Sequence, residues 1–329
     1  MLVFACAALA AATSAQAGPP QTSAGDLEVI EVRPNLYMIA GAGANIAVQV
    51  GPIGVILVNA GREDMADKVL AAVKKITDQP IRYILDTSGD ADVVGGNGKL
   101  SKAGRTILAG AVGQSGVTED VINNGGSAST LAQENVLLRM SAPTGKAAPF
   151  PEDEWPSKTY AFEKGYAMSI NGEGIQMIPV PHAHTDGDSI VLFRHTDVIV
   201  AGDVYDTTRF PVIDIEKGGG IQGEIAALNK LLELTIPPVP FPWDEGRTLL
   251  IPGHGRIGDD SDLVEYRDMI TIIRDNVQDY INSGMTLDQI KKADPAKAYR
   301  PRYGADTGPW TTDMFIEAIY KGLTERKGK

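Results

Sequence analysis

The chain has 329 residues, of which 43% are hydrophobic and 22% are charged, and this composition is typical of a globular protein rather than a disordered one. The length is enough for one large domain or two small ones. The formal net charge is −12, and the sequence contains no basic stripe of the kind that binds nucleic acid. We therefore expect no nucleic-acid partner.

The first 17 residues have the form of an export signal. They carry no charge, contain an apolar run over 2–12, and end in the small-x-small sequence Ala15-Gln16-Ala17. The usual positive charge at the start is missing, and the run is too short to span a bilayer. We predict a signal peptide over 1–17, a linker over 18–28, a periplasmic or secreted location, and no stable membrane insertion after cleavage. The alternative is a buried N-terminal helix.

Cysteine usage limits the chemistry. Cys6 is the only cysteine of the chain, and it lies within the predicted signal peptide. The mature chain would therefore have no disulfide and no thiolate ligand or nucleophile. Any metal would have to be held by nitrogen and oxygen atoms.

The first predicted elements are strands. Apolar and polar residues alternate over 28–60 with glycine turns between the runs, and 48–58 reads as a hairpin with a buried second strand. The apolar spacing over 64–76 predicts an amphipathic helix. A short buried strand is predicted over 81–85, followed by a short helix over 99–103.

Residues 110–160 are rich in Gly, Ser, Asn and Pro and show little periodicity, so we predict an irregular segment that covers one end of the domain. Strands are then predicted over 106–109, 167–170, 174–180, 189–193 and 198–201. Helices are predicted over 221–234, 263–282 and 311–323, with a capping box at Thr286–Gln289 that starts another. No internal repeat and no linker follows residue 28, which favours a single domain.

Three segments place potential metal ligands at the ends of predicted strands. They are Pro181-His-Ala-His-Thr-Asp-Gly-Asp-Ser189, Ala201-Gly202-Asp203 and Ile251-Pro-Gly-His-Gly255. Strand ends that bring imidazoles and a carboxylate together are a common way to build a metal site. The sequence therefore predicts that His184, Asp203 and His254 converge.

These segments and Gly95-Gly96-Asn97 follow a strand, a glycine loop and a helix, in an order that resembles the metallo-β-lactamase superfamily from about residue 30 to about residue 280. The resemblance implies an α/β fold (α+β in some schemes), a four-layer αβ/βα sandwich in a single domain, with two metal ions in a cleft at one edge. We expect this domain over 29–283 and a helical extension over 284–329 packed on the same domain.

The resemblance also assigns roles to individual residues. His184 matches the third His ligand of the first metal, and Asp203 matches the carboxylate that bridges both metals. His254 matches the last His ligand of the second metal. Asp92 matches the Asp of the family's His-x-His-x-Asp-His motif, which binds the second metal as well.

The same motif is altered in this chain. Ser88 and Asp90 stand at the positions of its first two histidines, and Val93 stands at the position of the last one. Asn59 replaces the Asp that supports this loop in the family. Ser88 is a poor ligand and Val93 is none, whereas Asp90 can act as a hard oxygen donor.

We therefore expect one divalent metal ion rather than two, bound by two histidines and two or three carboxylates. The predicted ligands are His184, Asp203, His254, Asp92 and Asp90. This donor set suits Zn first, with Mn or Fe as alternatives. Several carboxylates in one cleft need a cation to stay ionised, and Arg209 is an alternative source of positive charge.

The expected function is that of an exported metal-dependent hydrolase of a small-molecule ester, lactone, thioester or β-lactam. Asp92 or Asp90 would orient or deprotonate the attacking water. The alternative is a non-catalytic relative whose cleft binds a ligand or partner without turnover, and a mononuclear iron oxidation site is a third reading. The oligomeric state stays open. His182 is expected at the rim and His195 at the surface.

Overall fold

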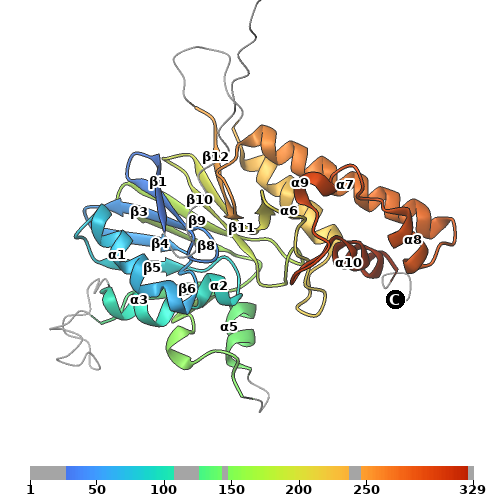
Figure 1. The fold of residues 1–329 in the computed structure, drawn as a ribbon. Coiled ribbons are helices and arrows are strands. Elements are labelled where there is room, and N and C mark those ends of the chain that lie inside the picture. The colour runs from blue at the N-terminus through green and yellow to red at the C-terminus, as the bar shows by residue number, and fades with distance from the viewer. Residues whose placement is uncertain (1–26, 107–125, 143–146, 237–245, 325–329) are drawn as a thin grey trace, which may run out of the picture.

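The computed structural model describes residues 27–106, 126–142, 147–236 and 246–324. The predicted signal peptide, nearly all of the predicted linker over 18–28 and, apart from Thr106, the predicted strand over 106–109 lie outside these residues. Within them the chain folds into two β-sheets with helices on their outer faces (Figure 1).

The first sheet contains seven strands in chain order, β1-β2-β3-β4-β5-β6-β7. Neighbours from β1 to β4 are antiparallel, and those from β4 to β7 are parallel. The strands are β1 (Glu28–Arg33), β2 (Leu36–Ala40), β3 (Ile46–Gly51), β4 (Gly54–Val58), β5 (Ile81–Leu85), β6 (Ser129–Gln133) and β7 (Lys158–Tyr160).

The second sheet contains five strands in the order β12-β11-β10-β9-β8. Only β11 and β12 are parallel, while the other pairs are antiparallel. The strands are β8 (Tyr166–Ile170), β9 (Glu173–Pro179), β10 (Ser189–Phe193), β11 (Val198–Asp206) and β12 (Leu249–His254).

Three hydrophobic clusters hold the layers together. Alternate residues of both sheets, among them Met38, Ile56 and Val191, face each other in the central cluster. The outer face of the first sheet packs on α1 (Ala66–Ile76) and α3 (Asn97–Ala103). The outer face of the second sheet packs on α6 (Ile221–Leu234), α7 (Asp260–Asn282) and α10 (Thr312–Thr324). The predicted four-layer α/β sandwich is confirmed.

Shorter elements complete the described chain. They are η1 (Glu63–Met65), α2 (Ala91–Val94), α5 (Glu134–Ser141), η2 (Glu152–Glu154), α8 (Leu287–Ala293) and α9 (Arg300–Tyr303). The capping box at Thr286 is present and starts α8. In the C-terminal part, α10 contacts α6, α7 and α8, and its apolar stripe is buried at Phe315, Ile319 and Leu323.

The prediction of an irregular segment over 110–160 is wrong for its described part. Strand β6 is fully buried between two parallel neighbours, and α5 follows it directly. The sequence of β6 is Ser-Thr-Leu-Ala-Gln, which shows no apolar run. Most of its polar side chains have partners inside the fold instead, since Thr130 and Ser157 exchange hydrogen bonds and the Gln133 side-chain oxygen accepts one from the Asn135 amide, while Gln133 Nε2 is buried without a partner among the described residues. Such tertiary partners are invisible to a periodicity argument.

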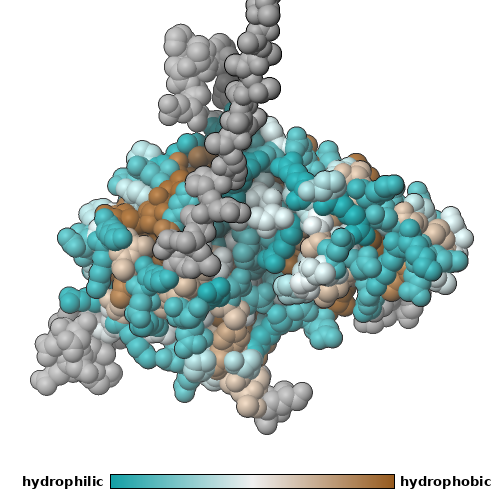
Figure 2. Space-filling model, viewed as in Figure 1, coloured by the Kyte–Doolittle hydropathy of each residue, from teal (hydrophilic) through white to brown (hydrophobic). Residues whose placement is uncertain are grey.

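The face of the molecule in Figure 2 is mostly hydrophilic, with hydrophobic residues in small separate patches. Among the helices that the structure describes, none combines the length and the apolar character needed to cross a membrane.

Candidate metal centre

A pocket of about 240 Å³ lies where β11 and β12 end, next to the loop that follows β5. All five residues predicted as metal ligands contribute to its wall. The lining residues are Asp90, Asp92, His184, Asp203, Asp206, Arg209, Val212, His254, Pro309 and Trp310.

The loop after β5 is held in place by Asn59. Its side-chain oxygen accepts hydrogen bonds from both the amide (3.1 Å) and the hydroxyl (2.9 Å) of Thr87, and its amide group donates to the carbonyl of Asn45 at 3.1 Å. Opposite, Gly202 has φ +57°, and a Cβ atom there would lie 2.7 Å from the Thr87 hydroxyl oxygen. The asparagine therefore still supports the loop, and a glycine lets β11 approach it closely.

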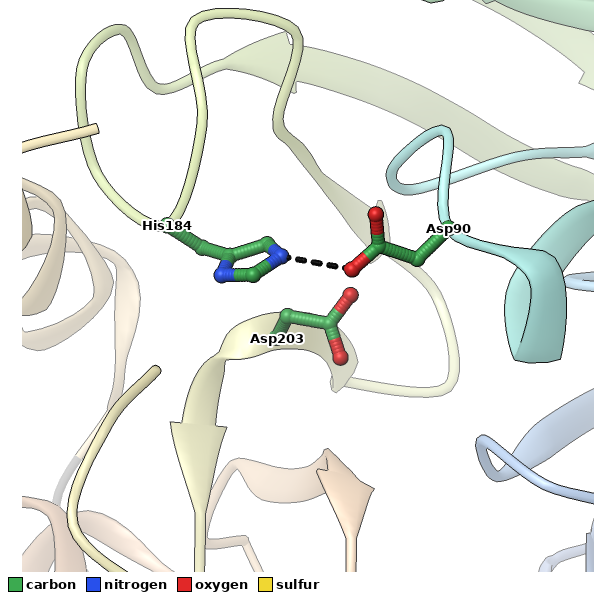
Figure 3. A group of neighbouring side chains, drawn as sticks. All are labelled: Asp90, His184 and Asp203. Carbon is green, nitrogen blue, oxygen red and sulfur yellow. Dashed lines mark hydrogen bonds and ion pairs between the residues drawn. The ribbon is translucent and has the colours of Figure 1, made fainter. Parts of the chain in front are cut away.

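Three of the predicted ligands point toward one another (Figure 3). Asp90 comes from the start of α2, His184 from the loop before β10, and Asp203 from β11. Each offers one ligand atom, and these atoms all lie within 4.8 Å of one another. His184 Nε2 is 2.8 Å from Asp90 Oδ2. This group is thus compact enough to surround one ion.

The His184 ring has an oxygen at each nitrogen. Nδ1 lies 2.8 Å from the carbonyl oxygen of Val212, and a carbonyl can only accept, so Nδ1 carries a proton. Nε2 faces the Asp90 carboxylate. It can carry a second proton and donate to this carboxylate, or it can be unprotonated and bind a cation that the carboxylate binds as well. Burial alone would lower the pKa of His184, but the hydrogen bond to Asp90 and the charges of Asp188 and Asp203 raise it well above its ordinary value. A metal ion would take the place of that Nε2 proton.

His254 is arranged differently. Its Nε2 is 2.8 Å from Asp92 Oδ2, while its Nδ1 lies 3.3 Å from Arg209 Nη2 and 3.8 Å from Asp203 Oδ1. A guanidinium only donates, so Nδ1 accepts and Nε2 donates to Asp92. Because Asp92 and Asp203 face opposite nitrogens of this ring, the three side chains do not surround one ion as they stand.

Positive charge reaches the site from two residues. Arg209, the candidate from the sequence, donates from Nε to Asp206 at 2.7 Å and lines the pocket. Lys217 was missed by sequence reasoning, and its Nζ lies 2.8 Å from Asp90 Oδ1 and 3.2 Å from Asp214. Burial would raise the pKa of Asp90, but its bonds to His184 and Lys217 lower it below the ordinary value.

The sequence does contain one indication that Lys217 lies near the site, namely the three glycines that follow it. A Cβ atom at Gly219 would lie 2.1 Å from the carbonyl oxygen of His184, so this loop needs glycine to pass so close to the site. A basic residue directly before such a run is a candidate for contact with the same site.

The residues that replace the family's histidines have other partners here. Ser88 donates from its hydroxyl to Asp203 Oδ2 at 2.8 Å. Val93 is 1% exposed and packs in a small apolar cluster with Val94, Val136 and Met140. The altered motif is therefore closed by hydrogen bonding and packing rather than left as a hole.

The other polar residues of the His184 loop brace it. The Asp188 carboxylate accepts from the amide (2.6 Å) and the hydroxyl (2.7 Å) of Thr185, and Asp186 pairs with Arg139. His182 and His195 are exposed. The pocket lining does not include Asp186, Asp188, His182 or His195.

The donors fit one divalent ion best at the Asp90 side. One imidazole nitrogen and two carboxylates face a common point, and the Val212 carbonyl holds His184 in the tautomer with Nε2 free for a metal. Burial raises the pKa of Asp203 even though His184 and His254 lower it, which is the condition of a carboxylate with too little positive charge around it.

No protein-family model matches the chain. A linear primary-alkylsulfatase from Pseudomonas sp. (strain ATCC 19151) is 24% identical over 298 residues, which cover 82% of this chain and 54% of the alkylsulfatase. The chain thus spans about half the length of this relative.

Two solved structures share the arrangement of layers. A metallo-β-lactamase from Pontibacter korlensis superposes with a TM-score of 0.52 at 16% identity, over 75% of this chain and 99% of the lactamase. The stereoselective inverting sec-alkylsulfatase Pisa1 from Pseudomonas sp. superposes with a TM-score of 0.59 at 14% identity, over 90% of this chain and 50% of the alkylsulfatase. At these identities the likeness concerns the fold, and the chain has the metallo-β-lactamase fold that its motifs predicted.

Proposed function

We propose that this protein is a metal-dependent hydrolase of small-molecule esters that works with one divalent ion. The support comes from the convergence of Asp90, His184 and Asp203 on one point of a pocket. We place the ion there, with Asp92 and His254 beside it. Zn is the first candidate metal, and Mn and Fe suit the same nitrogen and oxygen donors.

The ion, when bound, would acidify water and polarise the substrate oxygen. The chain's own residues then divide the remaining work. Asp92, which accepts a hydrogen bond from His254 and has a side chain that is 33% exposed, is placed to take up a proton from water. Asp90 is more constrained, because its two oxygens face His184 and Lys217. We therefore assign the proton transfer to Asp92 and the ligand role to Asp90.

Two residues of the pocket wall carry N–H groups close to the site. The Arg209 guanidinium lines the pocket and carries a positive charge next to the site. The indole N–H of Trp310 is buried and has no hydrogen-bond partner among the described residues. The Arg209 guanidinium would stabilise an oxygen atom on which negative charge develops during ester hydrolysis.

The substrate class follows from the comparisons only as a proposal. The relatives are a lactamase and alkylsulfatases, so the panel consists of β-lactams, lactones, thioesters, carboxylic esters and sulfate esters. We also propose export to the periplasm or medium, on the form of residues 1–17.

A second candidate function is ligand binding without turnover. The observation that favours it is the Lys217–Asp90 ion pair, which supplies positive charge to the altered motif without an ion. In this case the pocket would keep its shape and lose its metal chemistry.

Metal content and hydrolysis discriminate the two. Purified protein is reconstituted with Zn or Mn, its metal is measured by ICP-MS, and hydrolysis of nitrocefin, a lactone, a p-nitrophenyl ester and an alkyl sulfate is compared with that of His184→Ala. The exposed His195→Ala is the matched control. The hydrolase predicts about one ion per chain and activity lost only in His184→Ala. Sub-stoichiometric metal, or equal rates in all three proteins, would favour the non-catalytic relative.

A further inference from the structure

A second hollow opens directly beside the metal-site pocket. Its volume is about 520 Å³, and it lies between the segment before α6 and the start of α10. We call it the α10 groove. Its lining residues are Val212, Ile213, Asp214, Ile215, Glu216, Trp310, Met314, Glu317, Ala318 and Lys321.

The groove and the pocket share two residues, Val212 and Trp310. Val212 also binds His184 through its carbonyl oxygen. One wall of the groove is therefore attached to a proposed metal ligand. A molecule that reacts in the pocket has the groove as its neighbouring space.

The groove is largely apolar. Val212, Ile213, Ile215, Trp310, Met314 and Ala318 supply hydrocarbon surface. Met314 is 41% exposed, which is unusual for a large apolar side chain at a concave site and leaves its surface open to a ligand.

Three of the four charged residues that line the groove have ion-pair partners within the protein, and the fourth is Glu216. Asp214 pairs with Lys217 at 3.2 Å, and Glu317 pairs with both Lys291 and Lys321 at 2.8 Å. The groove therefore presents little net charge to a ligand from these pairs. An uncharged apolar chain suits the groove better than an ionic group, because an ionic group would lose hydration without gaining an ion-pair partner.

We propose that the α10 groove binds the hydrocarbon chain of the substrate, so that the protein prefers esters of alcohols with an alkyl chain of several carbons over esters of short alcohols. This inference rests on the proposed function, because the ester group of the same molecule would lie in the metal-site pocket. The wall from Met314 to Lys321 runs about 10 Å along α10, which is room for a chain of several carbons. The shared chemistry is the alkyl chain, whether the acid part is carboxylic or sulfuric.

The first test is a chain-length series. Ethyl, butyl, hexyl and octyl acetates and the matching alkyl sulfates are compared by kcat/KM. The groove predicts that kcat/KM rises by up to about fourfold per added methylene, which corresponds to ~0.8 kcal/mol of buried CH₂. Which of the two series is hydrolysed identifies the acid part. A flat series in an active enzyme would overturn the proposal.

Variants of Met314 test the location. Met314→Asp puts a charge into the groove and should abolish most of the chain-length dependence. Met314→Leu should keep the dependence. Ile272→Asp changes another exposed apolar residue, 46% exposed and outside the groove, and should keep it as well. The same dependence in Met314→Asp as in the natural protein would place the chain elsewhere.

A binding measurement separates this inference from the proposed function. Titration with 1-octanol and 1-butanol, followed by calorimetry, needs no turnover and no charge on the ligand. Tighter binding of 1-octanol that Met314→Asp removes and Ile272→Asp keeps supports the groove even if no ester is hydrolysed. Equal binding of both alcohols would overturn the groove, and ethyl-ester hydrolysis lost in His184→Ala would leave the hydrolase standing.

Discussion

The two sides of the metal-site pocket differ in how their charges are matched. On the Asp90 side, His184 lies between a carbonyl and a carboxylate, and Lys217 binds the outer oxygen of that carboxylate. On the Asp92 side, Nε2 of His254 binds Asp92, while its Nδ1 faces both Arg209 and, at 3.8 Å, Asp203. The first side converges on a point that a cation can occupy. The second side is already a closed hydrogen-bonded pair.

From the sequence alone, the Asp92 side would be expected to be the better metal site. The structure shows the opposite. Two motif positions at the Asp90 side, Ser88 and Asp90, no longer hold the family's histidines, yet the compact ligand group is found there. The changes were accompanied by new partners, a hydroxyl for Asp203 and an ammonium for Asp90. Loss of a ligand at one position is therefore a poor measure of the loss of the site.

The largest expected effect comes from removing the imidazole on each side. His184→Ala should lower metal affinity by more than about 100-fold, because even partners outside the ligand set cost about 10–100-fold. His254→Ala should cost only about tenfold, since its nitrogens are engaged by Asp92 and Arg209. Calorimetric titration with Zn measures both. Equal losses would mean that one ion is held by both sides.

Restoring the family's last histidine should damage the fold. Val93 is 1% exposed in an apolar cluster, so Val93→His inserts a larger polar ring without a partner and should destabilise by about 2–4 kcal/mol. Denaturant unfolding measures the change. Val264→His on α7, at a residue that is 39% exposed, is the control and should be near neutral. A stable Val93→His protein that binds a second ion would contradict this, because it would show that the fold still accepts the family's last histidine.

Much of this fold was accessible from the sequence alone. Strand β5 and helix α6 have the predicted bounds, because each is an apolar run or face between clear breaks. The convergence of Asp90, Asp92, His184, Asp203 and His254 in one pocket also matches the expectation.

The remainder depends on contacts between distant segments. Strand β6 is polar by composition and buried by its neighbours. Lys217 reaches Asp90 across 127 positions of the chain, and only the glycine run after it hinted at a close approach. Which ring nitrogen faces which oxygen cannot be derived from spacing, and that geometry decides between the two sides.

The pH dependence of metal binding should also differ between the sides. In the metal-free protein the pKa of His184 is raised well above its ordinary value and that of Asp90 is lowered, so Nε2 carries the proton and the carboxylate carries none. An ion at the Asp90 side must displace this proton. Affinity should rise about tenfold per pH unit until the folded pKa of His184 is passed.

Calorimetry in buffers of different ionisation enthalpy measures this release, which should be about one proton per ion. Asp90→Asn removes the main partner that raises the pKa of His184 and should shift the dependence to lower pH. Binding without proton release in the natural protein would argue for an ion elsewhere in the pocket.

Lys217 sharpens the comparison further, because it supplies charge to one side only. Lys217→Met removes the ammonium and leaves the Asp90 side more negative, so affinity for a divalent ion should rise by about five- to tenfold, limited by the 42% exposure of the lysine side chain. Lys230→Met, which breaks an exposed pair with Glu233, is the control. A fall in affinity would instead assign to Lys217 the role of holding Asp90 in position.

Ser88 should give the smallest effect, and it acts on the carboxylate that both sides share. Its hydroxyl donates to Asp203, whose pKa is already raised by burial, so Ser88→Ala removes one of the few donors that favour the ionised form. One such bond is worth about 1 kcal/mol, which predicts a loss of metal affinity of about fivefold. Ser88→Thr keeps the hydroxyl and should restore the natural value. If Ser88→Ala weakened binding as strongly as His184→Ala, the serine would itself be a ligand, and the altered motif would still supply two of its positions to the metal.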